Sequence, residues 1–260
     1  MTLHRNLDAT TGAILSGKVL QQGNALPHAP MAEERLPFTI KVARSEEQLG
    51  KAVAIRHAAY ARHVPALAEL LKAPEASDRE EGSVVLLAES KLDGSPLGTM
   101  RIQTNRCRKL ALEQSIDLPG WLRDKSLAEV TRLGVSSDRT GRVVKTLLFK
   151  ALFEYCEDAQ IDWMVIGARS PLDRQYEALL FKDVFPGGGF IPLSHAGNIP
   201  HRILAFEIES AQSRWDEANH PLYNLVFDTG HPDIQLHDSG PAFTHRARQP
   251  RRASQREAVH

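Results

Sequence analysis

The feature that most constrains the fold is the stretch of residues 127–152, in which the hydrophobic pattern changes from that of a strand to that of a helix. Its first half is apolar and β-branched with polar interruptions, and its second half repeats apolar residues at helical spacing, which predicts strand, turn and helix. A buried strand is expected at residues 161–168. Because a helical crossover joins the two strands, we expect them to lie parallel in one sheet. The chain therefore predicts an α/β fold.

The turn between this strand and helix carries groups that suit an anion. Two serines and Asp138 offer helix caps, and Gly141 permits tight backbone geometry. Arg139, Arg142 and Lys145 place positive charge beside a helix N-terminus, whose free N–H groups favour anions. We interpret this stretch as a phosphate-binding turn, and the alternative is an ordinary capped junction with a solvated basic surface.

The other patterns complete one mixed α/β domain over residues 36–210. The expected elements are a strand at 38–42, helices at 45–63 and 64–72, a hairpin of strands at 83–89 and 97–104, an irregular insertion at 105–126, the central strand, helix and strand, a helix at 172–181, and strands near 190–193 and 202–208. Residues 1–35 are expected to be a flexible arm with a short helix near 12–21. Residues 211–260 are expected to be an irregular extension with a possible helix at its start and a basic tail that is either solvated or in contact with an acidic protein.

Composition narrows the class of function. The 260 residues are 42% hydrophobic and 25% charged, and 32 basic residues balance 32 acidic ones, so bulk charge favours neither nucleic acid nor membrane. Neither a signal-peptide core nor a run long enough to cross a bilayer is expected. Cys107 and Cys156 lack metal-ligand spacing, and the eleven histidines show no metal pattern. These features favour a cytoplasmic protein without a metal.

The central strand carries a motif. Glu129, Thr131 and Arg132 are followed by Leu133 and Val135, in the order Glu-x-Ser/Thr-Arg-hydrophobic-x-Val. On this motif and its element order, the chain resembles the acyl-homoserine lactone synthases and the related long-chain N-acyl amino acid synthases, which have the GNAT acyltransferase fold. The resemblance covers residues 36–208. It implies a mixed sheet with splayed parallel fourth and fifth strands and helices on both faces.

Further matches lie upstream. Arg56 with Tyr60 resembles the pair of an arginine and an aromatic residue that the family carries on its first helix. Glu75 and Asp78 resemble the family's acidic residues before the second strand. Gly98 with Arg101 resembles the family's Gly-x-x-Arg motif on the third strand. The resemblance implies an ionic cluster that shapes the acceptor pocket, with one arginine binding the acceptor carboxylate. The implied substrate-binding residues are Arg56, Tyr60, Glu75, Asp78, Arg101 and Arg132. Scaffold or surface ion pairs are the alternative.

The phosphate turn departs from the GNAT pattern. Asp138 stands three positions before Gly141, and Val143 two positions after it, where the pattern has Gln or Arg and Gly or Ala. This departure makes the turn less suited to binding the pyrophosphate of coenzyme A. An acyl carrier protein presents a single phosphodiester, which needs fewer N–H groups. We therefore expect the acyl-phosphopantetheine of acyl carrier protein as donor, with acyl-CoA as the alternative and no permanently bound cofactor. The expected contacts of the arm are Val135, Arg139, Gly141, Arg142 and Lys145.

Amide formation from a thioester needs a base and a stabilised oxyanion. Glu129 is the candidate base, through water, with Thr131 on the same strand face. Arg132 points to the other face of a regular strand, so all three reach one site only if the strand bulges. Tyr176 matches a helix tyrosine that the resemblance places near the leaving sulfur, as proton donor. The alternatives are a Glu129 that merely pairs with an arginine and a Tyr176 that packs at the core edge.

The predicted function is an N-acyltransferase that makes long-chain N-acyl amino acids from acyl carrier protein and an amino acid acceptor. No nucleic acid partner and no stable membrane insertion are expected. The first helix lacks the tryptophan of the lactone synthases, which favours an amino acid acceptor. The alternatives are a homoserine lactone synthase using S-adenosylmethionine, an acyl-CoA-dependent GNAT enzyme, and a non-catalytic binder of acyl groups or carrier.

Overall fold

A mixed β-sheet runs through the part of the chain that the computed structural model describes, residues 32–237. Its strands are β2 (Phe38–Val42), β3 (Ser83–Ser90), β4 (Pro96–Thr104), β5 (Leu127–Val135), β6 (Trp163–Ala168), β7 (Lys182–Asp183), β8 (Ile191–Leu193), β9 (Ile199–Glu207) and β11 (Ile234–Gln235). They lie in the order β11-β2-β3-β4-β5-β6-β9-β7, with β8 also paired to β9. Two short strands, β1 (Ala32–Glu33) and β10 (Thr229–Gly230), form a separate parallel pair.

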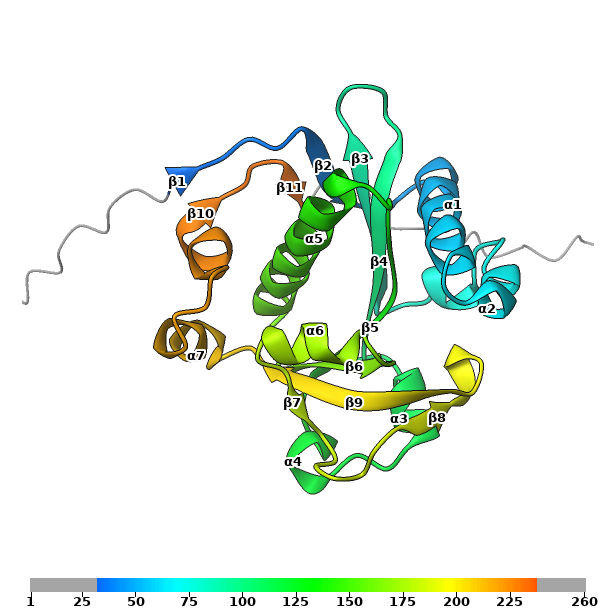
Figure 1. Cartoon of the computed structure of the whole chain (residues 1–260), viewed down its shortest axis with the longest axis vertical. Helices are drawn as coiled ribbons and strands as arrows, with labels where there is room; N and C mark the ends of the chain where they lie inside the picture. Colours follow the sequence, from blue (N-terminus) through cyan, green and yellow to red (C-terminus); the bar gives the residue numbers. More distant parts are fainter. Residues whose placement is uncertain (1–31, 238–260) are drawn as a thin grey trace, which may run out of the picture. The chain divides into compact units, whose positions relative to one another are not determined.

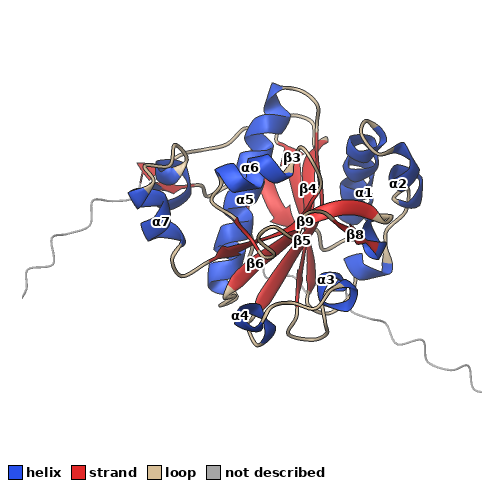
Figure 2. Cartoon of the chain, turned by 60° about the horizontal axis from the view of Figure 1, so that its bottom comes forward, coloured by secondary structure: helices blue, strands red, loops and turns tan. Residues whose placement is uncertain are grey.

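Helices cover both faces of this sheet, as the resemblance implies. α1 (Glu46–Ala61) and α2 (Pro65–Leu70) lie on one side, and α5 (Arg139–Asp158) lies on the other (Figures 1 and 2). The shorter helices are α3 (Ala111–Ser115), α4 (Gly120–Arg123), α6 (Asp173–Ala178) and α7 (Ala211–Glu217). The insertion at 105–126, expected to be irregular, thus contains two short helices. The mixed α/β fold class is confirmed.

Local sequence signals account for the helix starts. Ser45 accepts a hydrogen bond from the Gln48 N–H, and the Gln48 side chain returns to the Ser45 N–H, which forms the predicted capping box of α1. Asp138 caps α5 by accepting the Gly141 N–H. The apolar stripe of α5 then packs on the sheet in a core that includes Leu148 and Ile102, both fully buried.

β5 and β6 are parallel, as predicted, but they pair over only three residues. The register joins Leu127, Ala128 and Glu129 to 163–165, and no further β5–β6 pair follows within the described chain. β5 continues along β4, whereas β6 stays with β9, and the two halves of the sheet diverge beyond Glu129 (Figure 1). The splayed fourth and fifth strands that the resemblance implies are present.

The segment after residue 210 begins with the possible helix that the sequence indicated, and the rest of it is less irregular than expected. It contains α7, a π-helix at Asn224–Asp228 and β11, which runs parallel to β2. Trp215 of α7 is fully buried in the main core. The expected helix near 12–21 and the basic tail lie outside the described residues. No helix within 32–237 is long and apolar enough to cross a membrane.

Candidate functional site

The gap between β5 and β6 holds a cavity of about 710 Å³. Apolar side chains from β4, β5, β6, α5 and the segment after α6 form most of its wall: Met100, Leu133, Ile166, Phe149, Leu152 and Phe181. Polar groups are fewer, and they include Glu129, Thr131, Arg132, Tyr176 and His195. A largely apolar cavity of this size with a few converging polar groups is typical of a small-molecule site.

A β-bulge brings the motif of β5 to this cavity. Thr99 pairs with Gly134 and Arg101 with Thr131, so a single β4 residue between them faces two residues of β5. At the bulge Arg132 has a φ of 58°, in the left-handed region. The extra residue turns the Arg132 side chain toward the face that Thr131 occupies. The bulge that the shared site requires is therefore present.

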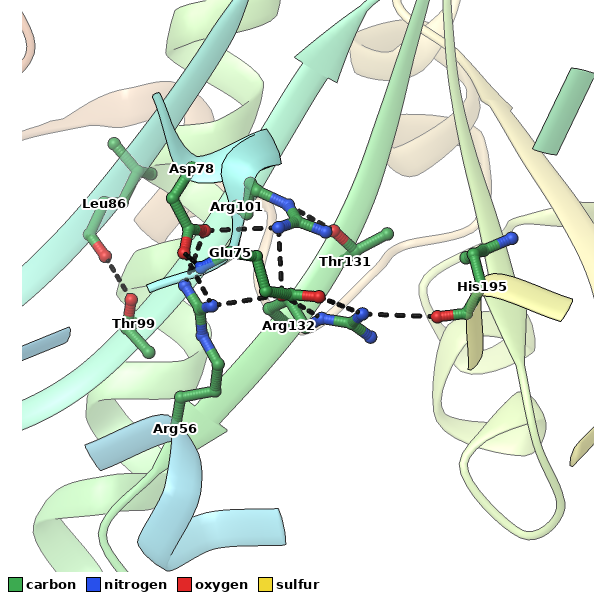
Figure 3. A network of polar contacts seen from close by, with 9 residues as sticks. All are labelled: Arg56, Glu75, Asp78, Leu86, Thr99, Arg101, Thr131, Arg132 and His195. Carbon is green, nitrogen blue, oxygen red and sulfur yellow. Dashed lines mark hydrogen bonds and ion pairs between the residues drawn. The ribbon is translucent and has the colours of Figure 1, made fainter. Parts of the chain in front are cut away.

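Two carboxylates and three guanidinium groups form an ionic cluster beside the bulge (Figure 3). Arg56 binds Asp78 through both terminal nitrogens, at 2.9 and 3.0 Å. Arg132 binds Glu75 through Nε and Nη2, at 2.7 Å each, and Arg101 contacts Glu75 at 3.0 Å and Asp78 at 3.2 Å. Burial alone would raise the pKa of Glu75, but its bond to Arg132 and the charges of the three arginines lower that pKa to about 2.

The six predicted acceptor-site residues divide into two groups. Tyr60 and Arg132 line the cavity, whereas the other four side chains lie behind its wall. Gly134 lets α1 approach β5, because a Cβ there would lie 3.1 Å from the Arg56 Cα. The three guanidinium groups exceed the two carboxylates by one positive charge. Arg132 is the member of the cluster that presents this charge to the cavity.

Glu129 is fully buried at the point where the strands part. Its Oε2 accepts the Leu112 N–H at 3.1 Å, and its Oε1 lies 3.3 Å from His195 Nε2. The arginines that could have paired with it bind Glu75 and Asp78 instead. Sequence reasoning missed His195, because one histidine among eleven carries no local signal, and only the fold brings the loop before β9 to β5.

The other predicted catalytic side chains also reach the cavity. Thr131 Oγ1 accepts a hydrogen bond from Arg101 Nε at 3.1 Å, which fixes its rotamer. Tyr176 reaches the cavity from α6, on the opposite wall from α1. Burial, with a smaller contribution from Tyr60, raises the pKa of Tyr176 to about 12. The phenol is therefore protonated at neutral pH and can donate a proton.

Asp138 already occupies part of the predicted phosphate turn. Its Oδ1 accepts the Gly141 N–H and the Ser136 hydroxyl, each at 2.8 Å, and these bonds lower the pKa of Asp138. A Cβ on Gly141 would lie 1.9 Å from the Ser136 carbonyl oxygen, so the turn itself requires glycine. The carboxylate thus occupies one N–H group of the predicted phosphate turn and adds negative charge beside it.

The remaining predicted donor contacts lie at different depths. Val135 and Lys145 line the cavity, and Lys145 Nζ donates to the Gln175 side chain at 2.7 Å. Burial lowers the pKa of Lys145. Arg139 and Arg142 are exposed and do not line the cavity. Within residues 32–237 no group of three or more His, Cys, Asp or Glu is placed to hold a metal ion.

The bulged, splayed sheet with a cavity at the split defines a fold of the GNAT acyltransferase type. No protein-family model and no curated protein matches the sequence. Among solved structures, the chain is similar to FeeM, an N-acyl amino acid synthase from uncultured soil microbes, with 16% identity and a TM-score of 0.55 over 70% of this chain and 96% of that one. It is also similar to BjaI, a CoA-dependent acyl-homoserine lactone synthase, with 16% identity and a TM-score of 0.51 over 75% and 93%. At these identities the likeness confirms the fold.

Proposed function

We propose that this protein is an N-acyltransferase that forms long-chain N-acyl amino acids by transferring a fatty acyl group from acyl carrier protein to an amino acid. The observation that carries the proposal is the apolar cavity of about 710 Å³ that opens where β5 leaves β6. Its apolar wall suits a fatty acyl chain, whose burial is favourable at about 25 cal/mol per Å².

The free thiols of Cys107 and Cys156 fit a reducing compartment, and we place the enzyme in the cytoplasm.

The donor arm fits along the edge of β5 that β6 leaves unpaired. Backbone N–H groups on that edge can bind the thioester carbonyl and stabilise the oxyanion that forms in the reaction. At the solvent-facing end of the donor arm, the α5 N-terminus and Lys145 offer positive potential to one phosphate group. The negative charge of Asp138 disfavours a second phosphate group. This arrangement favours a phosphopantetheine arm with a single phosphodiester over coenzyme A.

The acceptor fits between Arg132 and the buried acid. The uncompensated positive charge of the ionic cluster reaches the cavity through Arg132, which suits the carboxylate of a free amino acid. An amine held there lies in the cavity that Glu129 and His195 also line, and this pair supplies the proton acceptor. The neutral amine attacks the thioester carbon, and Tyr176 donates a proton to the departing thiolate.

Incubation of the purified protein with acylated carrier protein and a mixture of amino acids, followed by mass spectrometry, tests this function. N-acyl amino acids are the expected products. Formation of a lactone from S-adenosylmethionine would identify a homoserine lactone synthase. Turnover of acyl-CoA in the absence of carrier protein would identify a general GNAT enzyme. Carrier resonances that shift in NMR spectra without any product would identify a binding module. Each of these three outcomes contradicts the proposal.

Glu129→Gln is expected to lower the rate of acyl transfer at least tenfold, because general-base catalysis typically contributes about 10²–10⁴-fold. The amide keeps the size of the side chain and can still accept the Leu112 N–H, but it cannot hold negative charge beside His195. Steady-state kinetics at pH 7 measures the effect. Glu113→Gln is the matched control, because Glu113 binds the Leu110 N–H on the neighbouring turn and does not line the cavity. Equal rates for wild type and Glu129→Gln would exclude the acid from proton transfer.

Arg139→Glu combined with Arg142→Glu is expected to raise the KM for acylated carrier protein about fivefold to tenfold at low salt, with little change in kcat. Both residues are exposed beside the phosphate turn, so their charges act on an approaching acidic partner rather than on chemistry. The measurement is the KM at 20 and 300 mM NaCl, since the difference between variant and wild type should shrink as salt screens it. A KM that is unaffected at low salt would place the carrier elsewhere.

A further inference from the structure

His195 occupies a position that the motif of β5 does not explain. It lies in the 3₁₀ turn Ser194–Ala196 between β8 and β9, and its carbonyl oxygen accepts a bond from Arg132 Nη2 at 3.2 Å (Figure 3). Its ring bridges two other elements: Nε2 lies 3.3 Å from Glu129 Oε1, and Nδ1 lies 3.4 Å from Ser115 Oγ of α3. The backbone and the ring are thus both held, and the side chain lines the cavity.

Exposure separates the two members of the pair. Solvent reaches 21% of the side-chain surface of His195 and none of that of Glu129. A substrate amine in the cavity can therefore contact the imidazole more readily than the carboxylate, which lines the cavity but exposes no side-chain surface to solvent. A proton that leaves the amine meets His195 before it meets Glu129.

Both ring nitrogens face groups that can accept a hydrogen bond. Ser115 Oγ donates its own proton to the Ala111 carbonyl at 2.8 Å, so it offers a lone pair to His195 Nδ1. Glu129 Oε1 lies 3.3 Å from Nε2 and has no hydrogen-bond partner in the described chain, so this buried oxygen is available to accept a hydrogen bond from a proton-bearing Nε2. An imidazolium, which donates at both nitrogens, satisfies these acceptors better than a neutral ring does. The ring therefore faces a possible hydrogen-bond acceptor at each of its two nitrogens.

We propose that His195 is the general base of the acyl transfer and that Glu129 is a positioning residue that holds the ring and stabilises its charged form. This assignment rests on the proposed function. The imidazole takes one proton from the acceptor ammonium, and the freed nitrogen lone pair forms a bond to the thioester carbon. The tetrahedral intermediate expels the thiolate and loses its second N–H proton, so the products are an amide, a thiol and one proton released to solvent.

Four other groups set the charge that His195 experiences. Glu129 and Arg132, both on β5, carry opposite charges, and the Arg132 charge is paired with Glu75. Arg169, which follows β6, and His201 on β9 both line the same cavity, and burial lowers the pKa of His201. Removal of the Glu129 charge therefore leaves His195 among groups that are neutral or positive.

A titration that needs no substrate tests the pair. The pKa of His195 is measured by NMR of ring-labelled protein in the wild type and in Glu129→Gln, and we expect the variant to lower that pKa by at least one. His237, which is exposed and pairs with Asp158, is the internal control and should titrate identically in both proteins. A His195 pKa that does not change would overturn the assignment of Glu129. Because this result involves no turnover, it remains valid if the protein transfers no acyl group.

Kinetics then test the role of the base. His195→Ala is expected to lower kcat about hundredfold, to lose the acidic limb of the pH–rate profile, and to recover at least tenfold when imidazole is added. His237→Ala should retain the wild-type rate. Loss of rate in His195→Ala without imidazole rescue and with an unchanged pH profile would reduce His195 to a structural role.

Ser115 distinguishes the base from a nucleophilic triad. Ser115 Oγ does not line the cavity, so Ser115→Ala should cost only about fivefold, the value of one hydrogen bond. Complete loss of activity in this variant, together with an acyl adduct on Ser115 in intact-protein mass spectra of the wild type, would overturn the proposal. If the wild type transfers acyl groups from none of the donors tested, the proposed function is wrong, and the assignment of His195 as a base loses its reaction.

Discussion

Glu75→Gln is expected to destabilise the folded domain by about 3–5 kcal/mol, because removal of one partner from a buried ionic network leaves the opposite charges uncompensated. Glu75 is the carboxylate on which Arg132 and Arg101 converge. Without its charge, three buried guanidinium groups face Asp78 alone. Urea unfolding at pH 7 measures the loss.

The pH dependence of stability provides a second measure of the same group. The folded pKa of Glu75 is about 2 and its ordinary value is 4.5, so the unfolded state binds the proton more tightly. The stabilisation is therefore fully present above pH 5 and is lost as the pH falls toward 2. Linkage gives at most about 3 kcal/mol for this difference in pKa, and less once the partial exposure of Glu75 to solvent is taken into account. The slope of stability against pH between 5 and 2 should be steeper in the wild type than in Glu75→Gln.

Glu46→Gln is the matched control for this prediction. Glu46 also binds an arginine, Arg79, at 2.6 Å, but 68% of its side-chain surface is exposed. Solvent screening leaves such an exposed pair with little effect on stability. If both variants lost the same small amount of stability, the buried cluster would contribute no more than a surface ion pair, contrary to our expectation.

Local patterns in the sequence were sufficient to predict the helices and strands that surround the cavity. The change of period within residues 127–152 predicts both β5 and α5, and Ser45 with Gln48 predicts the start of α1. A helical crossover between two strands predicts their parallel order, which the register of β5 and β6 confirms. These signals work because propensity, capping and connection rules act over a few neighbouring residues.

The positions of the site groups depended on longer-range information. The resemblance named the arginines and carboxylates of the cluster, but the sequence could not show that Arg132, alone of the three arginines of that cluster, would reach the cavity. The bulge at Arg132 follows from how β4 and β5 align, a property of the pair rather than of either strand. His195 meets Glu129 across 66 residues of sequence, through a turn that only the assembled sheet positions.

The secondary structure after residue 210 also depends on long-range contacts that the local sequence does not show. β11 has two residues and no detectable period, and it is a strand only because the edge of β2 is available to it. The π-helix before it likewise has no signature in its composition. The boundary at residue 210 followed from the loss of periodicity, and that loss is a poor guide when short elements pack on a core already formed.

Trp215→Ala is expected to cost about 3–5 kcal/mol, the usual penalty for deleting a buried aromatic side chain from a core. Trp215 is fully buried, stacks on Phe149 with a centroid distance of 5.8 Å, and donates its indole N–H to the Leu179 carbonyl. Phe149 lines the cavity, so the C-terminal segment supports the wall of the candidate site.

Trp121→Ala is the matched control for this last prediction, since 43% of Trp121 is exposed and its ring meets Trp163 edge-on. It should cost about 1–2 kcal/mol, because only part of the side-chain surface returns to water. Urea unfolding of both variants, followed by circular dichroism, measures the difference. Equal costs would mean that residues 211–237 unfold independently of the sheet. A large cost for Trp215→Ala alone would establish that the acyltransferase-like domain extends well beyond residue 210 and depends on this segment to keep its cavity in shape.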